Sequence, residues 1–241
     1  MSRLASLSTP SRTSSTPLVP SPETKETTHH RMFRDLIQSI ISLIDQWDDL
    51  VSHDGPKYGK ICVDARTSIE NILQLEENPD RPSILPFLIQ LRNSRSSLND
   101  VLIKLDKSLG KLQSLVEVGE GLFIDAYSRE GVEFVLKTPM WMTWTMDRFV
   151  NSLPSIFTLH SIHLSKLRHL SQLISSSETT FDQSKLALEQ WQDLSRCGER
   201  HDEVEEWREL VEWEMTWGQP PSKTEEKEKL VTPKSGKKKG K

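Results

Sequence analysis

The feature that most constrains the fold is a run of leucines spaced seven residues apart near the middle of the chain. Two interleaved sets make up this leucine seam: Leu91, Leu98, Leu105 and Leu112, with Leu102, Leu109 and Val116. Steps of three and four residues keep one apolar stripe on one side of a helix, which is typical of a coiled coil. Such a stripe is stable in water only when another helix covers it. The sequence therefore predicts a helical scaffold, in which the covering helix can belong to this chain or to a partner.

Composition and charge exclude several classes of protein. Hydrophobic residues make up 35% of the 241 residues, a low share for a compact globule, so we expect unfolded segments. The formal net charge of −4 gives no overall attraction to nucleic acid or to acidic membranes. Cys62 and Cys197 are far apart and form no C-x-x-C pair, which indicates free thiols in a reducing compartment. No apolar run approaches the roughly 20 residues of a membrane span, so we expect no membrane partner.

The two ends of the chain differ in composition from its middle. Residues 1–28 are rich in Ser, Thr and Pro, and residues 219–241 end in a Lys-rich run, so we expect disordered tails around a helical coiled-coil domain over 29–218. Proline-directed motifs make three residues candidate phosphorylation sites, against the alternative of an unmodified tail: Thr9, Thr16 and Ser21. The basic run is a candidate nuclear import signal, against the alternative of a solvated tail: Lys234, Lys237, Lys238, Lys239 and Lys241.

Apolar periodicity between the tails predicts an all-α antiparallel helical bundle with long coiled-coil helices. We expect helices over residues 28–51, 57–77, 83–118, 147–174, 180–198 and 200–217. Asp54-Gly55-Pro56 is expected to end the first helix, and Gly119 with Gly121 to end the long leucine-rich one. Thr180 to Gln183 fit a capping box.

Residues 119–139 have the weakest periodicity, and we expect them to pack over the bundle as a loop. The cluster Met140-Trp141-Met142-Thr143-Trp144 follows directly. It fits either a plug in the core or an exposed docking patch, because Trp and Met are both favoured at interfaces. Four aromatic residues are candidate partner-binding residues, with core packing as the alternative for each: Trp141, Trp144, Phe149 and Trp191.

The sequence offers little basis for catalysis. No Gly-rich phosphate loop and no G-x-S-x-G motif occur, so we expect no enzyme, no catalytic residue and no cofactor. His160 and His163 lie one turn apart and could bind zinc, but no Cys, Asp or Glu lies within a turn of them, so we expect polar edges of a packed helix. A row of carboxylates is expected to form a solvated helix face: Glu203, Glu205, Glu206, Glu209, Glu212 and Glu214.

Several short motifs resemble the cyclin-dependent kinase 2-interacting protein family. Trp47-Asp48-Asp49-Leu50 is similar to that family's Trp-acid-x-Leu, and the leucine seam corresponds to its central coiled coil. Thr143-Trp144 followed by Phe149, with Trp191 further on, is similar to its Thr-Trp...Phe block and downstream Trp. Val211-Glu212 would match its C-terminal helix. The resemblance covers roughly residues 33–215; the basic tail, Pro154 and the interval 119–139 depart from it.

The resemblance implies a non-enzymatic nuclear adaptor. Its expected partners are cyclin-dependent kinases, replication checkpoint proteins and a AAA+ ATPase assembly that is also linked to ribosome biogenesis, and these partners would bind through helix pairing. Two alternatives remain open from the residues. A coiled-coil subunit of a cytoplasmic tether or spindle complex would show the same helix pattern. Nucleic acid could bind the basic tail, although the acidic helix before that tail argues against it.

Overall fold

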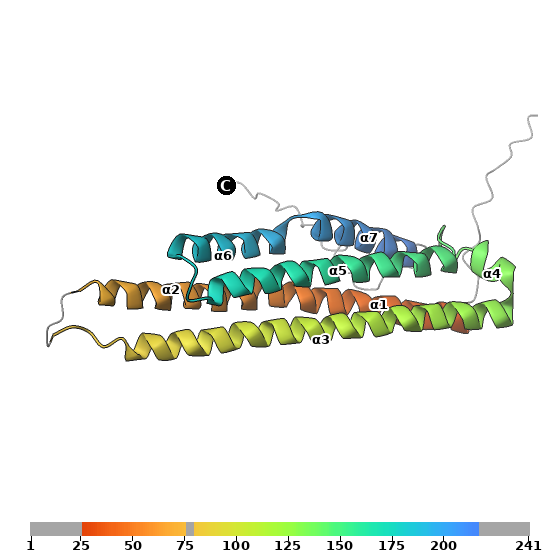
Figure 1. Cartoon of the computed structure of the whole chain (residues 1–241). Coiled ribbons are helices and arrows are strands. Elements are labelled where there is room, and N and C mark those ends of the chain that lie inside the picture. The colour runs from red at the N-terminus through yellow and green to blue at the C-terminus, as the bar shows by residue number, and fades with distance from the viewer. Residues whose placement is uncertain (1–25, 76–79, 217–241) are drawn as a thin grey trace, which may run out of the picture.

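The computed structural model describes residues 26–75 and 80–216, and the candidate phosphorylation sites and the Lys-rich run lie outside these ranges. The described residues form an all-α bundle, as the sequence predicts. Its elements are α1 (Thr28–Asp49), η1 (Leu50–Asp54), α2 (Gly55–Leu73), α3 (Leu85–Glu130), α4 (Val132–Leu136), α5 (Met146–Ser175), α6 (Phe181–Arg196) and α7 (Glu199–Thr216). Figure 1 shows the long elements running side by side and antiparallel: α1 with α2, α3, α5, and α6 with α7. None of the helices described is long and apolar enough to span a membrane.

The leucine seam is covered within the chain itself. Leu98 and Leu105 are fully buried on α3, in one cluster with Leu164 and Leu167 of α5 and with Ala187 of α6. Leu112 belongs to a second cluster, which α1, α5 and α7 complete. The sequence left open whether the covering helix belongs to this chain or to a partner. In the structure, helices of this chain cover the seam.

The first helix does not end at Asp54-Gly55-Pro56, contrary to the expectation. The chain passes through one π-helical turn, Leu50–Asp54, and continues as α2 with Gly55 still in the right-handed helical region. Pro56 lies in the first turn of α2, where a missing N–H is tolerated, and the wider π turn relieves the clash of its ring with the preceding turn. The result is one long rod in place of two helices joined by a loop.

The long helix does not end at Gly119 or Gly121, and the loop expected over 119–139 is mostly helical. The helix α3 runs on to Glu130 and ends at Gly131, which has a φ of 87°, before the short α4. A Cβ at Gly119 would lie 2.8 Å from Cδ1 of Leu153 and 3.3 Å from Cδ2 of Leu36. Glycine occurs there because α1 and α5 approach α3 closely, and not because the helix stops.

The α5–α6 turn marks the point where the bundle thins from four rods to two. The Arg66 guanidinium of α2 donates to the carbonyl of Ser176 at 2.9 Å and to Oγ1 of Thr179 at 3.1 Å. The helix that follows begins with the expected capping box at Thr180. Past the α5–α6 turn, α2 and α3 continue without α5 and α6 beside them (Figure 1). We call residues 69–75 and 80–91 the two-helix end.

Candidate interaction site

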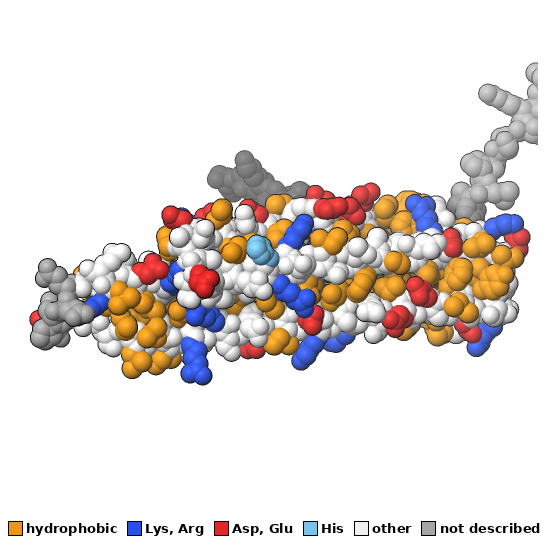
Figure 2. Space-filling model, in the orientation of Figure 1, with side chains coloured by type: hydrophobic (Ala, Val, Ile, Leu, Met, Phe, Trp, Pro, Cys, Tyr) orange, Lys and Arg blue, Asp and Glu red, His pale blue; other side chains and the backbone are white. Residues whose placement is uncertain are grey.

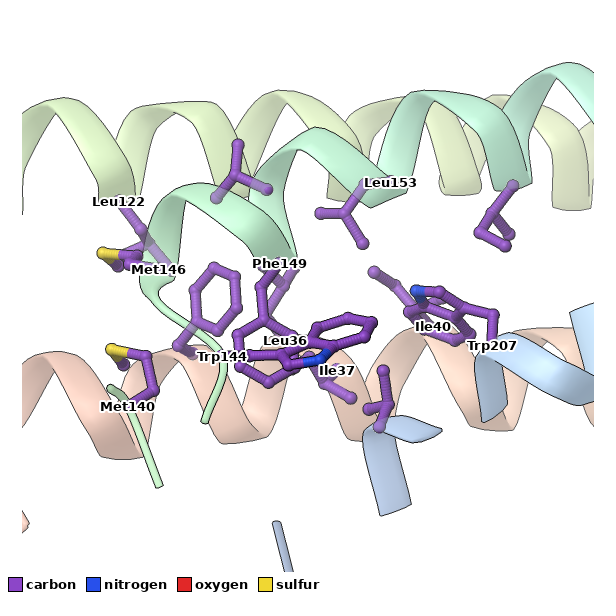
Figure 3. Close-up of a cluster of buried hydrophobic side chains, with 14 of the residues drawn as sticks. Leu36, Ile37, Ile40, Leu122, Met140, Trp144, Met146, Phe149, Leu153 and Trp207 are labelled. Atoms are coloured by element: carbon purple, nitrogen blue, oxygen red, sulfur yellow. The ribbon is translucent and has the colours of Figure 1, made fainter. Parts of the chain in front are cut away.

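The Thr-Trp...Phe block lies where the chain enters α5. A short loop closes with a hydrogen bond from the Met140 amide to the Trp144 carbonyl at 2.8 Å, and Thr145 then caps α5 by accepting from the Arg148 amide. Trp144 and Phe149 are buried with their ring centroids 4.9 Å apart, and Figure 3 shows them between α5 and the α1 side chains. The geometry favours the core-plug interpretation for Met140 and Trp144.

A carboxylate from the far end of the chain holds this loop. Glu214 on α7 is 1% exposed, and its Oε2 accepts from the amides of Met142, Thr143 and Trp144 at 3.2, 2.8 and 3.2 Å. Its Oε1 accepts from the Thr143 hydroxyl. Glu214 is therefore not part of a solvated face, contrary to the expectation for the acidic row. Amide donors converge on a charged acceptor, an arrangement stronger than neutral hydrogen bonds.

Trp141 is the one candidate aromatic that is not fully enclosed. Its indole N–H donates to Oε1 of Glu26 at 3.3 Å, and the Arg34 guanidinium lies 5.5 Å from its ring centroid. The inner edge of the ring meets Phe149 edge-on at 5.4 Å, while the side chain as a whole is half-buried. Trp141 thus connects the core block to the surface.

The α4 corner is an aromatic and aliphatic surface around Trp141. We define it by His30, Phe134 and Trp141 with the exposed α4 side chains Val132 and Leu136. His30 lies edge-on to both aromatic rings, with centroid distances of 5.9 Å to Phe134 and 6.1 Å to Trp141. Val132 and Leu136 are each 46% exposed. The corner combines rigid aromatic rings, exposed aliphatic groups and a nearby arginine, which are features of interaction hot spots.

Trp191 is fully buried at the junction of α1 and α2. Its indole N–H donates to the Val51 carbonyl at 3.0 Å, inside the π turn. A Cβ at Gly55 would lie 2.5 Å from atoms of the Trp191 ring, so the glycine makes room for the indole. Trp191 packs as a core residue and fixes α6 against the α1–α2 rod.

Beside that junction lies a hydrogen-bonded cluster that we call the histidine network: Trp47, His160, His163 and Arg200, which are buried, with Asp48, which is partly exposed. Trp47 Nε1 donates to His163 Nδ1 at 3.1 Å, and Arg200 Nη2 donates to His160 Nε2 at 2.9 Å. Arg200 also pairs with Asp48. His160 Nδ1 lies 2.7 Å from the Ile156 carbonyl and must carry the proton there. The network connects α1, α5 and the start of α7.

Both histidines of the network are neutral at pH 7. Burial, followed by the charge of Arg200, lowers the pKa of His160 to about 3, and the same two causes lower the pKa of His163 to about 3. The expectation that His160 and His163 form polar edges of a packed helix is wrong, because their side chains are only 1% and 3% exposed. The ring lone pairs that zinc would need already accept from Trp47 and Arg200. Within residues 26–75 and 80–216, no three His, Cys, Asp or Glu side chains group as metal ligands.

Comparisons with known proteins assign no family. No protein-family model matches the chain, and a search of curated proteins finds no significant match. The resemblance described from the sequence motifs therefore stays a prediction. The aromatic residues of its motifs nevertheless share one structural property, since Trp47, Trp144, Phe149 and Trp191 are all buried where helices meet.

Proposed function

We propose that the chain is a non-enzymatic nuclear adaptor that holds helical partner proteins together in DNA replication, the cell-cycle checkpoint and genome maintenance. By its motif resemblance, the expected partners are a cyclin-dependent kinase, checkpoint proteins and a AAA+ ATPase-associated complex with a further link to ribosome biogenesis. The protein would contribute positioned surfaces and no chemistry. No cofactor is part of this proposal.

The α4 corner carries the proposal. Trp144 and Phe149 are buried beneath the corner and support it, and Trp191 is buried at the α1–α2 junction, so none of the three offers area to a partner. Trp141 offers an edge to solvent and is braced from below by Phe149. A braced Trp beside Arg34 loses little conformational entropy when it binds, which is the property that makes such residues interface anchors. Apolar contact then contributes about 25 cal/mol for each Å² removed from water.

The test compares Trp141→Ala with Leu186→Ala. Leu186 is 53% exposed on α6, so its truncation removes exposed apolar surface away from the corner. Tagged full-length proteins, shown to be equally helical by circular dichroism, are expressed in cells and recovered with their partners for mass spectrometry. We expect kinase, checkpoint or ATPase subunits with wild type and Leu186→Ala, and their loss with Trp141→Ala. Equal recovery by all three would remove the α4 corner, and cytoplasmic or spindle localisation of the wild type would remove the nuclear assignment.

A further inference from the structure

The start of α3 is apolar on every side. Residues 82–91 contain no charged side chain, and six of the ten are large and apolar: Ile84, Leu85, Phe87, Leu88, Ile89 and Leu91. A helix that is apolar all round is expected to be buried on all sides. Leu85, Leu88 and Ile89 are nevertheless 60%, 44% and 53% exposed.

The cover is incomplete because only α2 lies beside this part of α3. Ile72 of α2 is 8% exposed and closes the contact between the two helices, whereas Leu73 on the next face is 57% exposed. The Arg81 guanidinium donates to the Ile72 carbonyl at 3.0 Å, which holds the end of the hairpin together. Figure 2 shows hydrophobic side chains gathered over this end of the molecule. Exposed apolar side chains gathered in one place, here Leu73, Leu85, Leu88 and Ile89, often mark interaction sites.

The missing cover corresponds to two helices. Elsewhere α5 and the α6–α7 rod complete the bundle, but neither reaches the two-helix end (Figure 1). We propose that the two-helix end of a second copy of this chain supplies them, so that two molecules overlap end to end and complete a four-helix bundle. A two-fold contact of this kind places each surface against itself. The uncharged stretch 82–91 permits this, because no like charges from it meet, and homodimer interfaces are correspondingly apolar and poor in charge.

Such a dimer does not depend on the adaptor function. The two-helix end lies at the opposite end of the bundle from the α4 corner (Figure 1), so each surface can be removed without touching the other. The dimer would leave both corners accessible.

The test measures the mass of the full-length protein by sedimentation equilibrium across the micromolar range. Wild type is expected to be a dimer, and the double variant Leu88→Glu with Ile89→Glu a monomer of unchanged helicity. The matched control is Ile124→Glu with Tyr127→Glu, at side chains 64% and 52% exposed near the other end of α3; it is expected to stay dimeric. Amide exchange over residues 84–91 should slow as the wild-type concentration rises.

A monomeric wild type would overturn the proposal, as would a dimeric Leu88/Ile89 variant or a monomeric control. A monomeric wild type that loses a nuclear partner through the Leu88/Ile89 change would assign the surface to another protein and not to a second copy. The Trp141→Ala experiment tests the α4 corner at the other end of the bundle, so failure of the dimer can be distinguished from failure of the adaptor function.

Discussion

The indole nitrogen of Trp191 donates a hydrogen bond to the main-chain carbonyl of Val51, 3.0 Å away. The π turn at Leu50–Asp54 disturbs the regular backbone ladder of the helix, and an indole from α6 fills the space above Gly55. The π turn and the Trp191 side chain therefore depend on each other: the turn presents the Val51 carbonyl, and the indole donates to it. The α1–α2 rod keeps its course through a Gly-Pro pair because α6 packs on it at that point.

Replacing Trp191 should show how strongly this contact stabilises the fold. Trp191→Phe keeps most of the apolar burial but leaves the Val51 carbonyl without its donor, so we expect a loss of about 1–3 kcal/mol in the free energy of unfolding. Trp191→Ala should lose about 3–5 kcal/mol. Urea unfolding followed by circular dichroism measures both. Tyr127→Phe, at an exposed aromatic on α3, serves as the control, and the prediction fails if Trp191→Phe is as stable as that control.

Acid should destabilise the fold through the histidine network. The pKa of His160 and of His163 is lowered to about 3 by burial and by Arg200, from the ordinary 6.5. The unfolded chain therefore binds more protons between these values, so the stability is fully present above about pH 6.5 and is lost as the pH falls toward 3. At about pH 5 each histidine should account for a loss of about 2 kcal/mol.

Urea unfolding at several pH values between neutrality and about pH 5 measures this slope. The double variant His160→Gln with His163→Gln cannot take up these protons, so its stability should fall less steeply over the same interval. An unchanged slope in the double variant would assign the acid sensitivity to other groups.

Glu214→Gln should loosen the entry to α5. The amide side chain can accept with only one oxygen and carries no charge, so part of the set of donors from Met142, Thr143 and Trp144 loses its acceptor. We expect about 1.5–3 kcal/mol of destabilisation. Hydrogen exchange should show faster exchange of these three amides. Glu212→Gln, at an exposed neighbour on α7, should change neither quantity, and equal effects of the two variants would refute the assignment.

Three glycines of α3 should respond with opposite signs to alanine. Gly110 and Gly121 have open space where a Cβ would lie, so Gly110→Ala and Gly121→Ala should each stabilise by roughly 0.5–1 kcal/mol. Gly119→Ala should destabilise, because its Cβ would lie 2.8 Å from the buried Leu153 side chain. Thermal unfolding of the three variants measures the difference. A stabilising Gly119→Ala would show that α5 can move away at little cost.

Patterns that depend on one helix alone could be predicted from the sequence. The leucine seam and the capping box at Thr180 each lie within a single segment, and the structure has both. The predicted ends of the first helix and of the long helix were wrong for a shared reason. Gly55 and Gly119 are glycines because a side chain of another helix approaches them, and sequence spacing does not record that approach.

The candidate site divides in the same way. The sequence picks out the tryptophans as residues with a role, but it cannot tell the half-exposed Trp141 from the enclosed Trp144, because both belong to one cluster of similar residues. Glu214 is one of eight acidic residues on α7, and only its contact with the loop before α5 distinguishes it from the others. The role of Glu214 depends on tertiary contacts, and no local sequence pattern indicates it.

The length of α3 has a consequence for anything the protein holds. Its 46 residues extend about 70 Å at the rise of an α-helix, and three further rods brace most of that span. Two partner proteins bound at its opposite ends would be held at a fixed distance and could not touch each other. The number of helical turns between the two binding surfaces would set that distance.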